Sequence, residues 1–154
     1  MQITYPDFQP EGRARAPIPT RAALISRYRY NLSVYSPQVL DHFEHPRNTG
    51  LVENADVSVQ VENPVCGDVL RLTARIEDCR IVEIKFLAKG CVPAMACASA
   101  LTELVKGKTL GEAQTITREQ LTAEVGRLPQ ASSHAAQLAI DSLTKMLRGC
   151  RQRQ

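Results

Sequence analysis

The sequence predicts an α+β fold in which helices pack on one face of a three-stranded antiparallel sheet. Residues 57–62, 70–76 and 82–86 each alternate apolar with polar side chains, which is typical of strands with one buried face and one face in water. After residue 92 the apolar residues recur at helical spacing instead. A block of strands followed by a block of helices is typical of α+β folds.

The elements can be predicted in order along the chain. Ser36 and Pro37 predict the start of a short helix, because serine caps helix N-termini and proline fits the first helical position. That helix ends before Pro46, and residues 48–50 form a turn. Because the link over residues 77–80 is too short for a crossover, the second and third strands should form a hairpin.

The helical part begins at Pro93, and the first of its helices ends at Lys106 and Gly107, the latter as a left-handed cap. A short turn over residues 111–114 and a helix over 117–125 follow. We expect the last helix to begin at Ser132 or Ser133 and to end at Gly149, which places Cys150 in a mobile tail.

The domain organisation follows from composition. Residues 1–33 hold four of the nine prolines and five arginines against Asp7 and Glu11, and they lack a periodic apolar pattern. We therefore expect a disordered basic N-terminal extension over 1–33, a folded domain over 34–150 and a tail over 151–154. The net charge of +3 resides in the extension, so the folded part lacks the basic surface of a nucleic-acid-binding protein.

No apolar run approaches the ~20 residues that span a bilayer, which predicts no membrane segment. The five cysteines fit no secreted disulfide framework and no secretory signal precedes them. A reducing, cytoplasmic setting is therefore the expectation, and thiols there are more often metal ligands or reactive groups than disulfides.

The hairpin brings two of the cysteines together. Cys66 and Cys91 lie the same number of residues before and after the turn at 78–79, so they should meet at the open end of the hairpin. Cys79 lies at the opposite tip, too far away to share a site with them.

Two further donors should lie beside these cysteines. Asp68 shares a strand face with Cys66, and His134 lies where the last helix begins. Cys91 directly precedes a helix, whose positive end should favour its thiolate form. Two thiols, one carboxylate and one imidazole could bind Zn²⁺ or an iron–sulfur cluster.

Several motifs in this chain resemble those of the U-type iron–sulfur cluster scaffolds (IscU/NifU-like). The resemblance covers about residues 34–148. The similar segments are Tyr35-Ser36-Pro37 to Asp41-His42-Phe43, Pro46 to Gly50, Val65 to Asp68, Lys89-Gly90-Cys91, Val105 to Leu110, Glu112-Ala113 and Leu128-Pro129 to His134.

The resemblance implies a scaffold rather than an enzyme, which assembles an iron–sulfur cluster, with [2Fe–2S] as the expected type, and transfers it. A cysteine desulfurase would supply sulfur, and apo iron–sulfur proteins would receive the cluster. Cys66, Asp68, Cys91 and His134 match the family's ligand positions.

The chain departs from the family pattern at two places. Ala135 occupies the position of the third cysteine, which is the family's usual sulfur acceptor. Residues 128–132 read Leu-Pro-Gln-Ala-Ser where the main branch has Leu-Pro-Pro-Val-Lys, so we do not expect release by an Hsp70-type chaperone.

Two alternatives remain open at this point. Ala135 supports a divergent Zn-binding or regulatory module of the same fold without assembly activity. A cysteine enzyme would use Cys66 or Cys91 as nucleophile, His134 as base and Asp68 to orient it, although no nucleophile signature is present. The remaining thiol, Cys97, should be a core residue, and His42 and His45 should be surface or packing residues.

Overall fold

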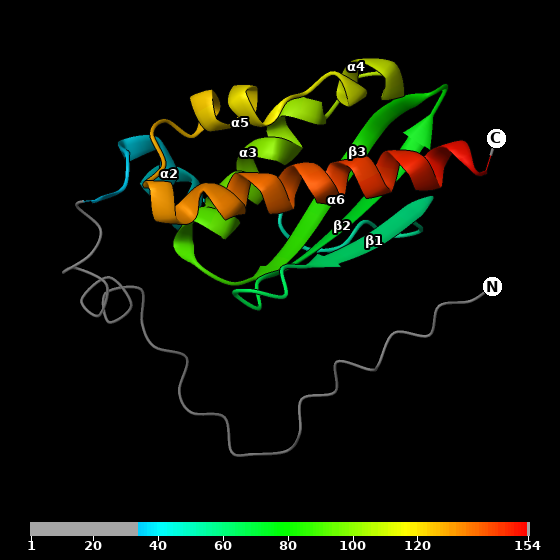
Figure 1. Ribbon diagram of the computed structural model, residues 1–154. Coiled ribbons are helices and arrows are strands. Elements are labelled where there is room, and N and C mark those ends of the chain that lie inside the picture. Colours follow the sequence, from blue (N-terminus) through cyan, green and yellow to red (C-terminus); the bar gives the residue numbers. More distant parts are fainter. Residues whose placement is uncertain (1–33, 154) are drawn as a thin grey trace. The chain divides into compact units, whose positions relative to one another are not determined.

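The computed structural model describes residues 34–153, which form an α+β fold (Figure 1). The predicted extension over residues 1–33 and the last residue of the predicted tail lie outside the described residues. The sheet has the order β1-β2-β3, built from β1 (Val57–Glu62), β2 (Val69–Glu77) and β3 (Arg80–Lys89), and both pairings are antiparallel. The predicted fold class is confirmed.

The β2–β3 hairpin is longer than the alternation of side chains suggested. Its pairs run from Glu77↔Arg80 at the tip to Val69↔Lys89 at the open end. The tip turns through Asp78 and Cys79, both in the left-handed region at φ 48° and 58°. A register shift between Arg75 and Ile76 marks a bulge. β3 therefore extends beyond the predicted 82–86 at both ends, because backbone pairing continues where the side-chain alternation has already stopped.

The helices lie on one face of this sheet. α3 (Val92–Val105) contacts β3, and α6 (Ser133–Arg151) contacts β1 and β2 and crosses in front of the sheet in Figure 1. α2 (Pro37–Glu44) and α5 (Arg118–Glu124) pack against α3, and α4 (Leu110–Gln114) packs against α6. Because α3 has neighbours on several sides, it is buried well beyond the single apolar stripe that the sequence suggested.

The C-terminal end of α6 corrects one expectation. The helix continues through Gly149 to Arg151, so Cys150 lies in the hydrophobic core at 6% exposure and not in a mobile tail. A side chain at position 149 would lie 3.3 Å from Val57 Cγ2. Gly149 therefore permits close packing of α6 on β1, and it does not terminate the helix.

The second face of the sheet is only partly in water, which corrects another expectation. The chain between α2 and β1 crosses this face: Thr49 forms a bridge with Phe86, and the Val52 N–H donates to the Thr73 hydroxyl. Thr73 is 3% exposed as a result. Arg75 remains exposed on the same face, as predicted.

Local capping explains where several helices begin. The Ser36 hydroxyl accepts from the Val39 N–H at the start of α2, as predicted. Thr109 and Thr117 form capping boxes at α4 and α5. His42 is buried, and its Nδ1 lies 2.9 Å from Ser99 Oγ, within hydrogen-bonding distance. We therefore interpret His42 as a packing residue.

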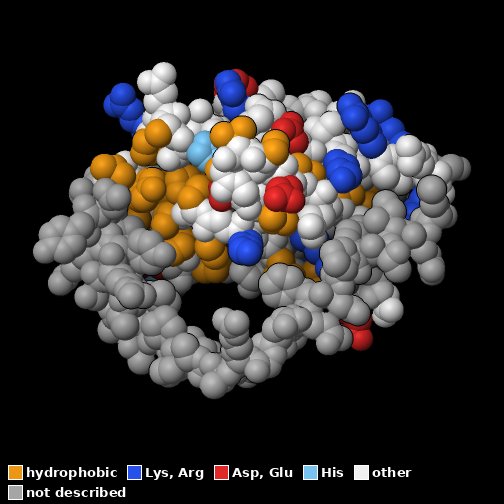
Figure 2. Space-filling view, turned by 60° about the horizontal axis from the view of Figure 1, so that its bottom comes forward, with side chains coloured by type: hydrophobic (Ala, Val, Ile, Leu, Met, Phe, Trp, Pro, Cys, Tyr) orange, Lys and Arg blue, Asp and Glu red, His pale blue; other side chains and the backbone are white. Residues whose placement is uncertain are grey.

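The surface of the described residues is mixed in character. On the face shown in Figure 2, hydrophobic side chains gather toward one side, and most lysines and arginines lie toward the other, interspersed with acidic side chains. In the part of the chain that the structure describes, no helix is long and apolar enough to cross a membrane.

Candidate metal and cluster site

The loop that joins β1 to β2 carries the first candidate ligand. Asn63 closes this loop, because its carbonyl accepts from the Gly67 N–H and its own N–H donates to the Asp68 carbonyl. Gly67 has a φ of 72°, a left-handed conformation that glycine adopts without strain. Cys66 is therefore presented on a closed turn at the open end of the hairpin, exposed and next to the 93% exposed Val65.

The second cysteine comes from the opposite strand of the hairpin. β3 ends at Lys89, and Cys91 occupies the N-cap position of α3 with extended backbone at φ −75° and ψ 166°. Its side chain makes no capping hydrogen bond, so the thiol is available to the site. Cys91 is half-buried, whereas Cys66 is exposed.

Asp68 lies at the centre of the candidate site. Its side chain is 6% exposed, and its Oδ2 accepts a hydrogen bond from the Cys91 thiol at 3.2 Å. The same oxygen lies 3.8 Å from His134 Nε2. One donor atom each from Cys66, Asp68 and His134 lie within 4.8 Å of one another. The structure thus groups Cys66, Asp68 and His134 together, and Cys91 joins them through its hydrogen bond to Asp68.

His134 reaches this site from the first turn of α6. A short 3₁₀ turn (Gln130–Ser132) leads into the helix, and Ser132 occupies the N-cap position without a side-chain capping bond. The imidazole is partly exposed, so it lies at the solvent side of the site. The predicted position of His134 at a helix start is confirmed.

The protonation of Cys91 differs from the expectation. Burial raises the pKa of the Cys91 thiol to about 11, and the neighbouring Asp68 carboxylate raises it as well, although the nearby backbone N–H of Ala94 acts in the opposite direction. The prediction that the helix start favours a thiolate is therefore wrong for the metal-free protein. A bound cation would have to displace this proton.

Tyr35 is a neighbour of the site that the sequence did not single out for this role. Burial raises the pKa of Tyr35, and the nearby Cys91 raises it further. Tyr35 precedes the capping Ser36, so the start of α2 places its ring near the second cysteine. In the sequence, Tyr35 was notable only as the first residue of the Tyr35-Ser36-Pro37 motif.

The other three cysteines lie elsewhere. Cys97 is fully buried, as predicted, and burial raises the pKa of its thiol to about 12. Cys150 lies in the core, and Cys79 is exposed at the far tip of the hairpin. Ala135, which follows His134, is 1% exposed and adds no donor atom.

Comparison with known proteins places this chain. The NifU-like N terminal domain matches residues 34–154. The chain belongs to the NifU-like N-terminal domain family. The predicted resemblance is therefore confirmed over the whole described region.

Two relatives of this NifU-like domain and one solved structure illustrate the similarity. The chain is 44% identical over 114 residues to the iron–sulfur cluster assembly scaffold protein IscU 1 of Archaeoglobus fulgidus, covering 74% of each chain. It is 42% identical over 113 residues to the scaffold protein IscU of Escherichia coli, covering 71% of this chain and 88% of that one. The N-terminal part of a NifU-like protein from Brucella abortus shares the fold at a TM-score of 0.64 and 17% identity, covering 80% and 98%.

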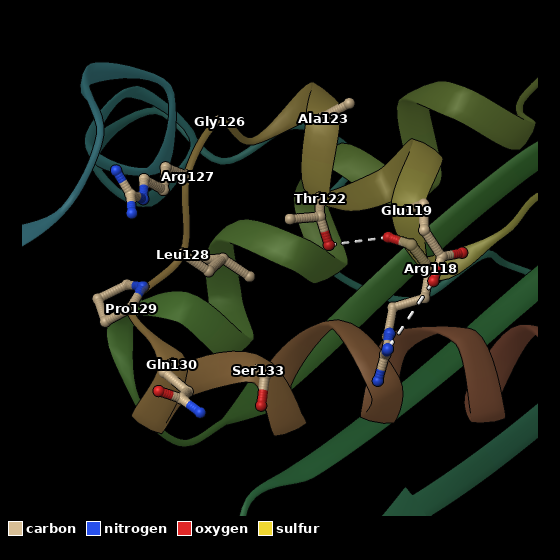
Figure 3. Close-up of a pocket in the computed structure, with 10 residues that line it drawn as sticks. All are labelled: Arg118, Glu119, Thr122, Ala123, Gly126, Arg127, Leu128, Pro129, Gln130 and Ser133. Carbon is tan, nitrogen blue, oxygen red and sulfur yellow. Dashed lines mark hydrogen bonds and ion pairs between the residues drawn. The ribbon is translucent and has the colours of Figure 1, made fainter.

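A groove lies beside the site in this NifU-like domain, between α5 and the start of α6 (Figure 3). Its volume is about 620 Å³, and its wall includes Leu128, Pro129 and Gln130 from the segment that departs from the family pattern. None of the four candidate ligands lines it. The groove and the metal-ligand candidates are therefore separate features of the surface.

Proposed function

We propose that this chain is a scaffold on which an iron–sulfur cluster is assembled and from which it passes to acceptor proteins. The observation that carries the proposal is the placement of Cys66, Cys91 and His134 beside the Asp68 carboxylate. Relatives at 44% and 42% identity that are named as iron–sulfur cluster assembly scaffolds support it.

This set of four ligands suits a cluster that the protein binds temporarily and then transfers. The soft thiolates of Cys66 and Cys91 would hold iron, whereas the Asp68 carboxylate and the His134 imidazole are harder ligands and would exchange more readily. A ligand set with both kinds of donor can bind a cluster and still release it. Four donors also match the four terminal positions of a [2Fe–2S] cluster, which is the type we propose.

The four candidate ligands differ in burial, so the site has an inner side and a solvent side. Asp68 and Cys91 lie on its inner side, whereas Cys66 and His134 are accessible from solvent. A protein partner would therefore approach the Cys66 side. We propose a cysteine desulfurase as the sulfur donor and apo iron–sulfur proteins as recipients, with the chain itself acting as a carrier and not as an enzyme. We place this exchange in the cytoplasm, where thiols remain reduced.

Anaerobic reconstitution with ferrous iron, cysteine, a desulfurase and a dithiol reductant, which supplies the electrons that convert persulfide sulfur to sulfide, tests the proposal. We expect visible absorbance and Mössbauer spectra of a bound [2Fe–2S] cluster in the parent protein. Cys66→Ala and Cys91→Ala should each lose most of the bound cluster, because each removes a thiolate.

Cys79→Ala is the matched control, since Cys79 is exposed but lies at the other end of the hairpin. It should bind as much cluster as the parent. Two outcomes would contradict the proposal: a parent protein without a cluster, or a Cys66→Ala variant that binds as much as the parent. Stoichiometric Zn²⁺ that resists replacement by iron would identify a zinc module instead.

A further inference from the structure

Gly90 lies directly against the Asp68 side chain. An alanine methyl at position 90 would lie 2.5 Å from Asp68 Oδ1 and 2.6 Å from Asp68 Cγ. Both distances are far shorter than the ~3.5 Å of an ordinary non-bonded contact. There is therefore no room for a side chain at position 90 while the Asp68 carboxylate keeps its present position.

The backbone conformation of Gly90 does not by itself require glycine. Gly67 and Gly107 have φ values of 72° and 80° and open space around them, so their conformation is the reason for glycine there. Gly90 is not among the glycines with a positive φ. The three atoms nearest to a methyl at position 90 all belong to the Asp68 side chain: Oδ1, Cγ and, at 3.0 Å, Cβ.

The two oxygens of Asp68 have different surroundings. Oδ1 lies on the side of Gly90, whereas Oδ2 is 3.2 Å from the Cys91 sulfur and 3.8 Å from His134 Nε2. The carboxylate is thus held with one oxygen toward the backbone and one oxygen toward the other candidate ligands. Because Asp68 is nearly fully buried, it has little freedom to turn away from this arrangement.

We propose that Gly90 is a positioning residue for Asp68, and that the slot left by its missing side chain makes Asp68 present one oxygen, Oδ2, to a metal at this site. This inference rests on the proposed metal-binding role of the site. It predicts that a methyl group at position 90 displaces the carboxylate while Cys66, Cys91 and His134 remain able to bind.

Titration of the metal-free protein with Co²⁺ under anaerobic conditions tests this inference without any cluster assembly. We expect Gly90→Ala to weaken Co²⁺ binding by about 10- to 100-fold, the range typical for loss of a group that orients a metal ligand. The thiolate-to-cobalt charge-transfer absorption should persist, because both cysteines still bind. The ligand-field bands should change in the same way as in Asp68→Ala, because both variants lose the carboxylate.

The double variant Gly90→Ala/Asp68→Gly decides whether position 90 acts through Asp68, because a methyl at position 90 would also lie 3.0 Å from Asp68 Cβ, which only glycine removes. With the whole Asp68 side chain gone, the added methyl should change Co²⁺ affinity by less than about twofold relative to Asp68→Gly, because groups in one network are not additive. Gly111→Ala is the matched control: the nearest atom to its methyl would be 4.0 Å away, and we expect Co²⁺ binding equal to that of the parent.

Three results would overturn the inference: parent-like Co²⁺ binding by Gly90→Ala, an equal loss of affinity in the Asp68→Gly background, or no Co²⁺ binding by the parent. If Gly90→Ala does not fold, the double variant Gly90→Ala/Asp68→Gly must fold, because every Asp68 atom that the methyl would overlap is gone. A double variant that also fails to fold overturns the inference. A parent that binds Co²⁺ in this way but never forms a cluster would contradict the proposed function alone.

Discussion

The thiol of Cys91 donates a hydrogen bond to Asp68, with 3.2 Å between the sulfur and Oδ2. The thiol therefore keeps its proton, and the carboxylate makes loss of that proton harder. A metal cation bound by both groups would reverse this preference. Metal binding at this pair would then be coupled to release of the thiol proton.

Replacement of Asp68 should make Cys91 more reactive. Burial is the larger cause of the raised pKa of Cys91, near 11, and Asp68 adds to it, so Asp68→Ala should lower the pKa only in part. At pH 8 we expect iodoacetamide to label Cys91 several-fold faster in Asp68→Ala than in the parent, measured by site-resolved mass spectrometry. In the parent the labelling rate should keep rising above pH 9. A parent rate that levels off near pH 9, or an equal gain in the exposed-acid control Asp141→Ala, would contradict this explanation.

A third thiol beside His134 should prolong cluster binding. Ala135→Cys adds a soft donor at the residue that follows the imidazole, and we expect its reconstituted cluster to survive a chelator challenge severalfold longer than that of the parent. Ala136→Cys is the matched control, because Ala136 is equally buried but lies one helical step of about 100° further round α6. Equal lifetimes for the two variants would show that position 135 has no special relation to the site.

His42 should make stability depend on pH below about 6.5. Burial lowers the pKa of His42 below 6.5, and the charge of Arg47 acts in the same direction. As the pH drops below 6.5, the imidazole of His42 binds a proton more readily in the unfolded chain than in the folded chain. The free energy of unfolding therefore falls. The fall approaches about 1.4 kcal/mol per pH unit for one proton.

The His42→Gln variant should lose less stability between pH 7.5 and pH 5.5 than the parent, as measured by thermal unfolding. His45→Gln, a change at a histidine that is exposed, is the control and should retain the slope of the parent. If His42→Gln and the parent show the same slope, proton uptake by His42 does not explain the pH dependence.

Gly126 should be required for stability. It has a φ of 74°, and an alanine methyl there would lie 2.8 Å from the Ser36 hydroxyl, which donates to the Val125 carbonyl at 2.5 Å. We expect Gly126→Ala to reduce the free energy of unfolding by about 1–3 kcal/mol, because backbone strain and overlap add together. Denaturant unfolding measures this loss. Gly111→Ala should be neutral in the same assay, and equal losses in both variants would rule out the proposed contact.

Local patterns in the sequence were enough to predict the β2–β3 hairpin. The alternation in β2 and β3, together with a link too short for a crossover, predicts that Cys66 and Cys91 lie at one end of the hairpin. Features that depend on contacts distant in sequence were not accessible in this way. Gly149 looks like a helix end, but its lack of a side chain serves packing on Val57.

The protonation of Cys91 shows the same limit. A helix start favours a thiolate, and that much is visible in the sequence. The opposing effects of burial and of Asp68 arise only once the fold has placed the carboxylate beside the sulfur. Nothing in the sequence indicates that Thr73 is covered, because the segment that holds Val52 has no periodic pattern and its contact with Thr73 is made by the backbone N–H.

The outer edge of β3 is fastened near both of its ends, by the Thr49↔Phe86 bridge and by the Arg80↔Thr109 bridge. A strand that slides by two residues moves about 6.6 Å along its neighbour, enough to separate Cys91 from Asp68. Because both bridges hold β3 in register, sliding of the strand would break several backbone hydrogen bonds at once. The distance between Cys91 and Asp68 therefore depends on strand alignment as well as on the short links that carry the two residues, and loss of either bridge should disturb it.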